Sequence, residues 1–242
     1  MKKSVEIYST PYELAEELAK ELVSMINRSA KMEKQFSLAL SGGSTPELLF
    51  SLLGKQYANS VQWNFVHFFW GDERCVPPDD PESNFRMVRE KLFDKISISP
   101  SNIHRIKGEN DPDTEAVVYS DDISEHMVKR DGLPVFDCII LGLGDDGHTA
   151  SIFPENIELL NSAKICEVSI HPLTHQKRIT LTGNVINNAE SVIFLVAGKK
   201  KAVIVESIIN SSPSSVDFPA SHIAPVYGKL KWMTDKNAAA LL

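Results

Sequence analysis

Residues 135–151 read VFDCIILGLGDDGHTAS, and the change from apolar residues to polar residues and glycines within this stretch decides the fold. Val135–Leu141 is a short apolar run of the kind that forms a buried strand. A loop with three glycines, two aspartates and a histidine follows at once. Glycine lets the backbone turn tightly and approach other groups closely, while Asp and His are the usual parts of an acid/base device. The alternative interpretation is a plain polar turn.

Short β-rich runs of this kind alternate with longer amphipathic segments along the chain. This alternation is typical of an α/β fold with a mostly parallel sheet. No repeat, low-complexity tract or linker interrupts it, so we predict one domain over residues 1–242. The expected strands are Val5–Tyr8, Phe36–Leu40, Phe65–Trp70, Val135–Leu141, Lys164–Val168, Ile179–Thr182, Val192–Ala197 and Lys231–Thr234.

Helices are expected between these strands. Thr10-Pro11-Tyr12-Glu13 supplies an N-cap, a proline at the first helical position and a Glu at N3, so a helix should run from there to about Arg28. Another helix should follow Ser83. The segment 113–129 should form a helix packed on the sheet, because its apolar residues lie on roughly one face: Ala116, Val117, Ile123, Met127 and Val128.

Composition limits the class of protein. The chain has 242 residues, of which 43% are hydrophobic and 24% charged, and a formal net charge of -7. Because non-specific binding to nucleic acid or to anionic membrane needs clustered positive charge, we expect neither partner. The three cysteines form no CxxC pair, and no apolar run approaches the ~20 residues that span a bilayer. A soluble protein of the reducing cytoplasm is expected.

The loop in LALSGGSTPELLF, residues 38–50, is a candidate anion site. A strand ends there in Ser41-Gly42-Gly43-Ser44-Thr45, and Pro46 should open a helix with Thr45 as its N-cap. Free backbone N–H groups and the positive end of the helix dipole would suit a phosphate. A tight turn is the alternative. The GxGxxG and GxxxxGK[ST] spacings are absent, which disfavours a dinucleotide site or a P-loop.

A second candidate lies in HFFWGDERCVPPDDPESNF, residues 67–85, directly after an aromatic strand. Arg74 is suited to bidentate contact with phosphate. Asp72 or Glu73 could bind hydroxyls or take a proton, although charged surface residues after a strand are common. Cys75 is interpreted as a small apolar neighbour rather than a nucleophile.

Two further loops carry charged groups. Asp146 precedes His148 by two residues, close enough to set the tautomer and charge that a histidine base needs. In VIFLVAGKKKAVIVESII, residues 192–209, three lysines open a helix and oppose its dipole, which is costly unless an anion or solvent lies close by. Solvated lysines remain the alternative for two of the three.

The other histidines indicate no metal site. His171 and His175 are four residues apart, but Pro172 between them argues against a helix that would align them as ligands. His67, His104 and His126 have no polar companions nearby in the sequence. Neither a metal nor another cofactor is predicted.

Six ordered blocks together carry a resemblance to a known family. They are SGGSTP at 41–46, GDERCVPPDDPESN at 71–84, LGLGDDGHTASIFP at 141–154, RITLT at 178–182, GKKKA at 198–202 and WMTDKNAA at 232–239. In this order and spacing the chain resembles the 6-phosphogluconolactonases, within the superfamily that also contains the glucosamine-6-phosphate deaminases.

The resemblance implies a deaminase-like, Rossmann-type open sheet with helices on both faces. It also implies hydrolysis of 6-phospho-D-glucono-1,5-lactone, a small phosphosugar lactone, in the second step of the oxidative pentose phosphate pathway. His148 would activate water with Asp146 as its partner. Apart from the resemblance, we expect a monomer, with a homo-oligomer as the alternative. The residues that would bind the substrate and its phosphate are Gly42, Gly43, Ser44, Thr45, Asp72, Arg74, Arg178 and Lys201.

Two alternatives remain. A deaminase or isomerase of amino-sugar phosphates would use Asp72 as a proton shuttle, but the GDER and GHTAS blocks are of the lactonase kind. A non-catalytic sugar-phosphate sensor would keep the binding loops without the chemistry. The intact Asp146/His148 pair and the lack of a DNA-binding segment in these residues disfavour the sensor.

Overall fold

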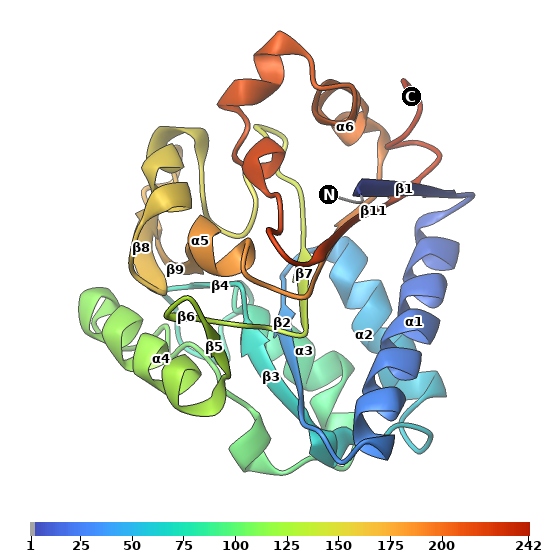
Figure 1. Cartoon of the computed structure of the whole chain (residues 1–242), viewed down its shortest axis with the longest axis vertical. Helices are drawn as coiled ribbons and strands as arrows, with labels where there is room; N and C mark the ends of the chain where they lie inside the picture. Colours follow the sequence, from blue (N-terminus) through green and yellow to red (C-terminus); the bar gives the residue numbers. More distant parts are fainter. Residues whose placement is uncertain (1–2) are drawn as a thin grey trace.

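A six-stranded parallel sheet forms the centre of the computed structural model, which describes residues 3–242 (Figure 1). Its strand order is β1-β11-β10-β7-β2-β3, and each of its pairings is parallel. The strands are β1 Lys3–Tyr8, β2 Phe36–Leu40, β3 Val66–Trp70, β7 Cys138–Leu141, β10 Ser191–Val196 and β11 Lys229–Asp235. The prediction of a mostly parallel α/β sheet is therefore confirmed.

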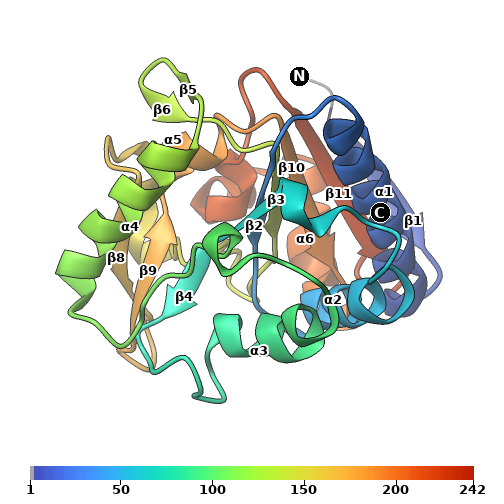
Figure 2. The ribbon, with the colours of Figure 1, turned by 90° about the horizontal axis from the view of Figure 1, so that it is seen from below.

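Helices cover both sides of this sheet. Helices α1 and α2 pack together on one side, while α4 lies on the other side against the segments 166–170 and 177–181 (Figures 1 and 2). The α-helices are α1 Pro11–Lys31, α2 Ser44–Gln56, α3 Asn84–Lys91, α4 Pro112–His126, α5 Gly183–Ile186 and α6 Ala202–Ile209. Short 3-10 helices are η1 Trp63–Phe65, η2 Phe93–Lys95, η3 Pro100–Asn102, η4 Pro154–Asn161, η5 Lys199–Lys201, η6 Pro213–Asp217 and η7 Pro219–His222.

Local capping signals placed two helix starts correctly. At α1 the Thr10 hydroxyl accepts a hydrogen bond from the Glu13 N–H at 3.1 Å, and the Glu13 carboxylate accepts one from the Ser9 N–H at 2.8 Å. The first bond satisfies a backbone donor that the first turn leaves free, and the second satisfies the N–H of the residue before the N-cap. Ser83 caps α3 in the same way, accepting from the Arg86 N–H at 3.1 Å.

The predicted start of α2 was wrong. The helix begins at Ser44 with Gly43 as its N-cap, so Thr45 lies inside the first turn. Gly43 has a φ of 107°, in the left-handed region that glycine adopts readily, and this turns the chain into the helix earlier. The Gly43 carbonyl accepts the first helical hydrogen bond, from the Glu47 N–H. Pro46 is tolerated because its missing N–H belongs to the first turn.

The predicted face of α4 was also partly wrong. The helix ends at His126, and Val117 and Val128 are 60% and 79% exposed. Val117 lies about 100° around the helix from Ala116, and Val128 follows the helix end. The residues that α4 buries are Glu115, Ala116, Tyr119 and Ile123.

A second, antiparallel sheet was not anticipated. The expected strands near 164–168 and 179–182 form, as β8 Cys166–Ile170 and β9 Lys177–Leu181, but they lie outside the parallel sheet. They pair with β4 Asp72–Arg74 in the order β4-β9-β8, which places Arg74 opposite Arg178. A hairpin of β5 Lys129–Arg130 and β6 Leu133–Pro134 completes the strands.

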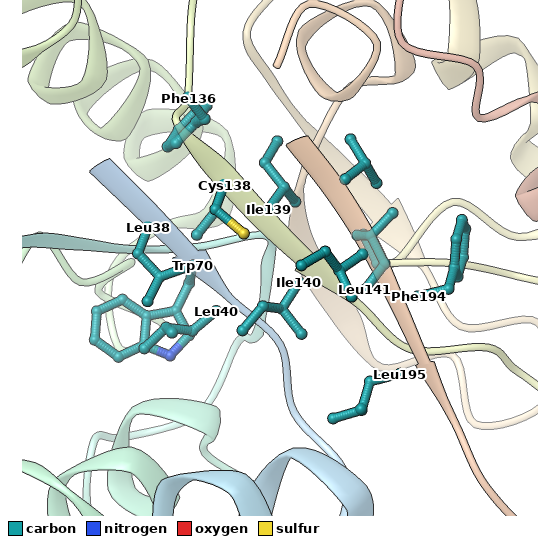
Figure 3. Close-up of a cluster of buried hydrophobic side chains, with 14 of the residues drawn as sticks. Leu38, Leu40, Trp70, Phe136, Cys138, Ile139, Ile140, Leu141, Phe194 and Leu195 are labelled. Carbon is teal, nitrogen blue, oxygen red and sulfur yellow. The ribbon is translucent and has the colours of Figure 1, made fainter. Parts of the chain in front are cut away.

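The core is centred on β7, each residue of which is buried (Figure 3). Side chains from the neighbouring strands surround it, including Leu38 and Leu40 of β2 and Phe194 of β10. Such close packing gives the loop after β7 a rigid base. Within residues 3–242, no helix is both long and apolar enough to cross a membrane.

Candidate active site

A cleft of about 640 Å³ opens where the loops after β2, β7 and β10 meet. These three strands are neighbours in the sheet, and the crevice outside the carboxyl ends of parallel strands is the usual ligand site of such folds. Of the predicted site residues, those that line it are Gly42, Gly43, Asp72, Arg74, Asp146, His148, Arg178 and Lys201. Ser44 lines a separate hollow beside α3, and Thr45 is not part of the cleft lining.

His148 and Asp146 form a hydrogen-bonded pair at one side of the cleft. The His148 Nδ1 lies 2.6 Å from the Asp146 Oδ1, and the His148 backbone N–H donates to the same oxygen at 3.1 Å. A carboxylate at Nδ1 holds the proton there, which leaves Nε2 as the nitrogen that can accept one. The imidazole is 24% exposed, so water can reach it.

The charge state of Asp146 follows from this contact. Burial alone would raise the pKa of Asp146, but the hydrogen bond and charge of His148 outweigh it and lower the pKa to about 2. The carboxylate is therefore ionised at neutral pH and can stabilise an imidazolium. Gly144 makes room for the pair, because a Cβ there would lie 2.1 Å from the His148 Nδ1.

Two arginines come from the antiparallel sheet. Arg74 and Arg178 are opposite each other on β4 and β9, so two positive charges are close neighbours. Within the described chain, the Nε atoms of both are buried without a hydrogen-bond partner. Burial also lowers the pKa of Arg178, and the charge of Arg74 adds to this effect. An anion bound between them would relieve both the repulsion and the unsatisfied donors.

Lys201 faces the cleft from the loop after β10. It forms an ion pair with Asp145, whereas Lys199 and Lys200 are exposed to solvent. The hydrogen bond and charge of Lys201 lower the pKa of Asp145. Of the two adjacent aspartates, Asp145 thus pairs with Lys201 and Asp146 with His148.

Asp72 is a link between loops as well as a lining residue. Its buried carboxylate accepts a hydrogen bond from the Ser151 hydroxyl at 2.6 Å, and its carbonyl accepts one from the Asn84 amide at 2.9 Å. Asn84 in turn packs against Gly42, where a Cβ would meet its Oδ1 at 2.0 Å. These contacts connect the 41–43 loop to the antiparallel sheet.

Glu73 faces the protein interior. Its buried carboxylate accepts hydrogen bonds at 2.8 Å from the backbone N–H groups of Arg74, Asn84 and Phe85 and one at 3.1 Å from the Ser83 hydroxyl. Burial nevertheless raises the pKa of Glu73 to about 6. The residue caps the start of α3 rather than binding hydroxyls. Burial also raises the pKa of Cys75 to about 11, as expected for a residue that is no nucleophile.

Sequence reasoning missed His171 and Phe153 as parts of the site. His171 lines the cleft from the β8–β9 turn, and its Nδ1 accepts from the backbone N–H groups of Leu173 and Thr174 at 3.2 Å. The buried Phe153 ring contacts both histidines, with centroid distances of 4.7 Å to His148 and 5.1 Å to His171. The pairing of Lys201 with Asp145 was also missed, since no local pattern links them.

Comparisons with known proteins agree with this architecture. A family model described as glucosamine-6-phosphate isomerases/6-phosphogluconolactonase matches residues 9–232. Proteins named 6-phosphogluconolactonase from Haemophilus influenzae and Treponema pallidum are 43% and 40% identical over 85% and 86% of this chain and 87% of their own length. The 6-phosphogluconolactonase structure from Trypanosoma brucei is 28% identical, with a TM-score of 0.87 over 100% of this chain and 99% of that one.

Proposed function

The chain belongs to the glucosamine-6-phosphate isomerase/6-phosphogluconolactonase family, and from this membership we propose that it hydrolyses 6-phospho-D-glucono-1,5-lactone to 6-phospho-D-gluconate. This is the second step of the oxidative pentose phosphate pathway. The observation that carries the proposal is that one cleft holds a His–Asp pair and an arginine pair. The first can activate water, and the second can hold a phosphate.

His148 is the general base of the proposed reaction. Its Nε2 takes a proton from a water molecule as the oxygen attacks the lactone carbonyl carbon. Asp146 holds the Nδ1 proton and stabilises the imidazolium that results. When the tetrahedral intermediate collapses, the bond to the ring oxygen breaks and the imidazolium returns its proton to that oxygen. Because the ester carbonyl is already electrophilic, a positioned water and one base suffice.

The phosphate is the part of the substrate that the arginines would bind. Arg74 and Arg178 offer guanidinium groups that match phosphate oxygens, and Lys201 adds a third positive charge. Binding at this distant group would orient the carbonyl toward His148. Gly42 and Gly43 line the same cleft, and we assign their backbone N–H groups as the donors for the developing oxyanion.

A deaminase reaction is disfavoured by the surroundings of Asp72. That reaction needs a carboxylate free to shuttle protons, whereas Asp72 is only 4% exposed and its carboxylate accepts a hydrogen bond from the Ser151 hydroxyl. A non-catalytic sensor is disfavoured because binding alone does not need a carboxylate hydrogen-bonded to a histidine, and Asp146 and His148 form such a pair in the cleft.

Three broader predictions accompany this proposal. We infer one domain over residues 1–242, supported by one hydrophobic core cluster whose members run from Leu14 to Ala238 along the chain. A cytoplasmic location is supported by the three free cysteines. The monomeric state stays a prediction.

The decay of freshly made lactone, with and without protein, tests the proposal when coupled to 6-phosphogluconate dehydrogenase. Spontaneous hydrolysis sets the baseline. Replacing His148 by Ala should depress turnover by about 10²-fold or more, the usual size of general-base catalysis. His175→Asn is the matched control, because His175 is exposed, lies outside the cleft lining and has a positive φ that Asn tolerates.

The wild-type protein tests the proposed function, and the His148→Ala variant tests the assigned base. Decay at the background rate with the wild-type protein would refute the proposed function. Rapid turnover that persists in His148→Ala would keep the function but refute the assigned base.

A further inference from the structure

Three histidines and an aspartate gather away from the cleft, near the start of β3 and the end of α4. His104 Nδ1 lies 3.0 Å from the Asp122 Oδ1, and His126 Nδ1 lies 3.1 Å from the same oxygen. His67 Nδ1 lies 2.8 Å from the other ring nitrogen of His104. None of these residues lines the cleft that holds His148.

The spacing of the ligand atoms suits a small divalent ion. One nitrogen from each of His104 and His126 and one oxygen of Asp122 lie within 4.8 Å of one another. Zinc is bound by nitrogen and oxygen at about 2.0–2.1 Å, so two of its ligands at a tetrahedral angle are about 3.3 Å apart. The observed 3.0 and 3.1 Å nitrogen–oxygen separations are therefore close to what the ion needs. A small rotation of the exposed His126 ring would complete the set.

The ring of His104 is already fixed in the required orientation. It is buried and stacks on Phe69, with ring centroids 4.3 Å apart and planes 7° apart. With an ion at Nδ1, the Nε2–H would donate to His67 Nδ1, the usual arrangement for a metal-binding histidine. Little conformational freedom would thus be lost on binding.

The remaining ligands are accessible and favourably placed. Asp122 and His126 lie one turn apart in the last turn of α4, where the helix dipole favours positive charge. Their side chains are each 32% exposed, and both border a surface cavity of about 540 Å³. His126 Nδ1 also lies 2.9 Å from the Asp122 carbonyl oxygen, to which it can donate a hydrogen bond. An ion bound at Nδ1 would take the place of the proton in that bond. An ion could therefore enter from solvent.

We propose that His104, Asp122 and His126 bind one divalent first-row transition ion, with Zn²⁺ the best matched. Two imidazoles and one carboxylate leave a fourth position for water, as in zinc sites with three protein ligands. The ion would join the loop after η3 to the end of α4 and stabilise the folded chain by mass action. The proposal is independent of the lactonase reaction.

Isothermal titration of the chelator-treated protein with ZnCl₂ tests this site. The titration uses a His148→Ala background, because the pair in the cleft could otherwise compete for the ion. One equivalent should bind, and His126→Gln and Asp122→Asn should each weaken it by about 10-fold or more, whereas His175→Asn should not. Co²⁺ in place of Zn²⁺ should show the visible absorption of a four-coordinate site. Circular dichroism in chelator checks that each variant is folded.

Two results would overturn the proposal. One is the absence of any heat of binding at millimolar Zn²⁺. The other is binding of the same strength in both ligand variants, which would place the ion elsewhere on the surface. Since two different ligands are replaced, the failure of one variant to fold leaves the other to decide.

Discussion

Replacing Gly144 by Ala should disable the His148–Asp146 pair without touching either residue. The added Cβ would lie 2.1 Å from Nδ1 and 2.3 Å from Cε1 of the ring, and 2.5 Å from the Asp146 Oδ1. Non-bonded atoms prefer about 3.5–4.0 Å, so the ring and the carboxylate must each move by about 1 Å or more. The 2.6 Å hydrogen bond between them cannot survive such a displacement.

The expected loss of turnover follows from that displacement. A reacting group misplaced by about 1 Å can cost about 10²-fold, so kcat in the coupled lactone assay should fall at least that far. Binding of 6-phosphogluconate, measured by calorimetry, should persist because the arginines lie on another sheet. Gly71→Ala is the control, since a Cβ there meets only the Leu40 carbonyl at 3.5 Å and the residue lacks a positive φ. Near wild-type turnover in Gly144→Ala would refute the reasoning.

Two further predictions concern the charged groups. Arg178→Lys keeps the charge but loses the bidentate fork, so KM for the lactone should rise about 10-fold or more with kcat changed less; a fall in kcat at constant KM would contradict the phosphate assignment. Because the pKa of Asp146 is lowered from 3.8 to about 2, its contribution to folding stability is complete above the unfolded value and is lost as the pH falls through about 2. Urea unfolding of wild type and Asp146→Asn should thus differ above the unfolded pKa of 3.8 and converge toward pH 2, and a difference that widens in acid would be the opposite result.

Local signals in the sequence predicted the parts of the fold that depend on neighbours along the chain. The capping box at Thr10 and the N-cap at Ser83 were found because each acts within one helical turn. The β2 strand was placed residue for residue at Phe36–Leu40, since all its residues are buried. The glycine-rich loop after β7 was predicted because polar residues and glycines directly follow a run of buried apolar residues.

Contacts between distant segments could not be predicted in this way. A strand of three polar residues, Asp72–Arg74, has no hydrophobic pattern that distinguishes it from a loop. Nothing in the spacing says that it would pair with β9 and align Arg74 with Arg178. Likewise His104 shows no companion along the chain, yet Asp122 lies beside it in space. The family resemblance named the arginines but could not supply this geometry.

The position of Phe153 couples the two parts of the candidate site. Its buried ring lies 4.7 Å from the His148 ring and 5.7 Å from the Arg178 Cζ, so one side chain contacts both the base and a cation. Under the proposed function, a substitution that shifts this ring would displace the base and the phosphate contact together. Turnover and substrate binding thereby share one buried aromatic side chain as their common support.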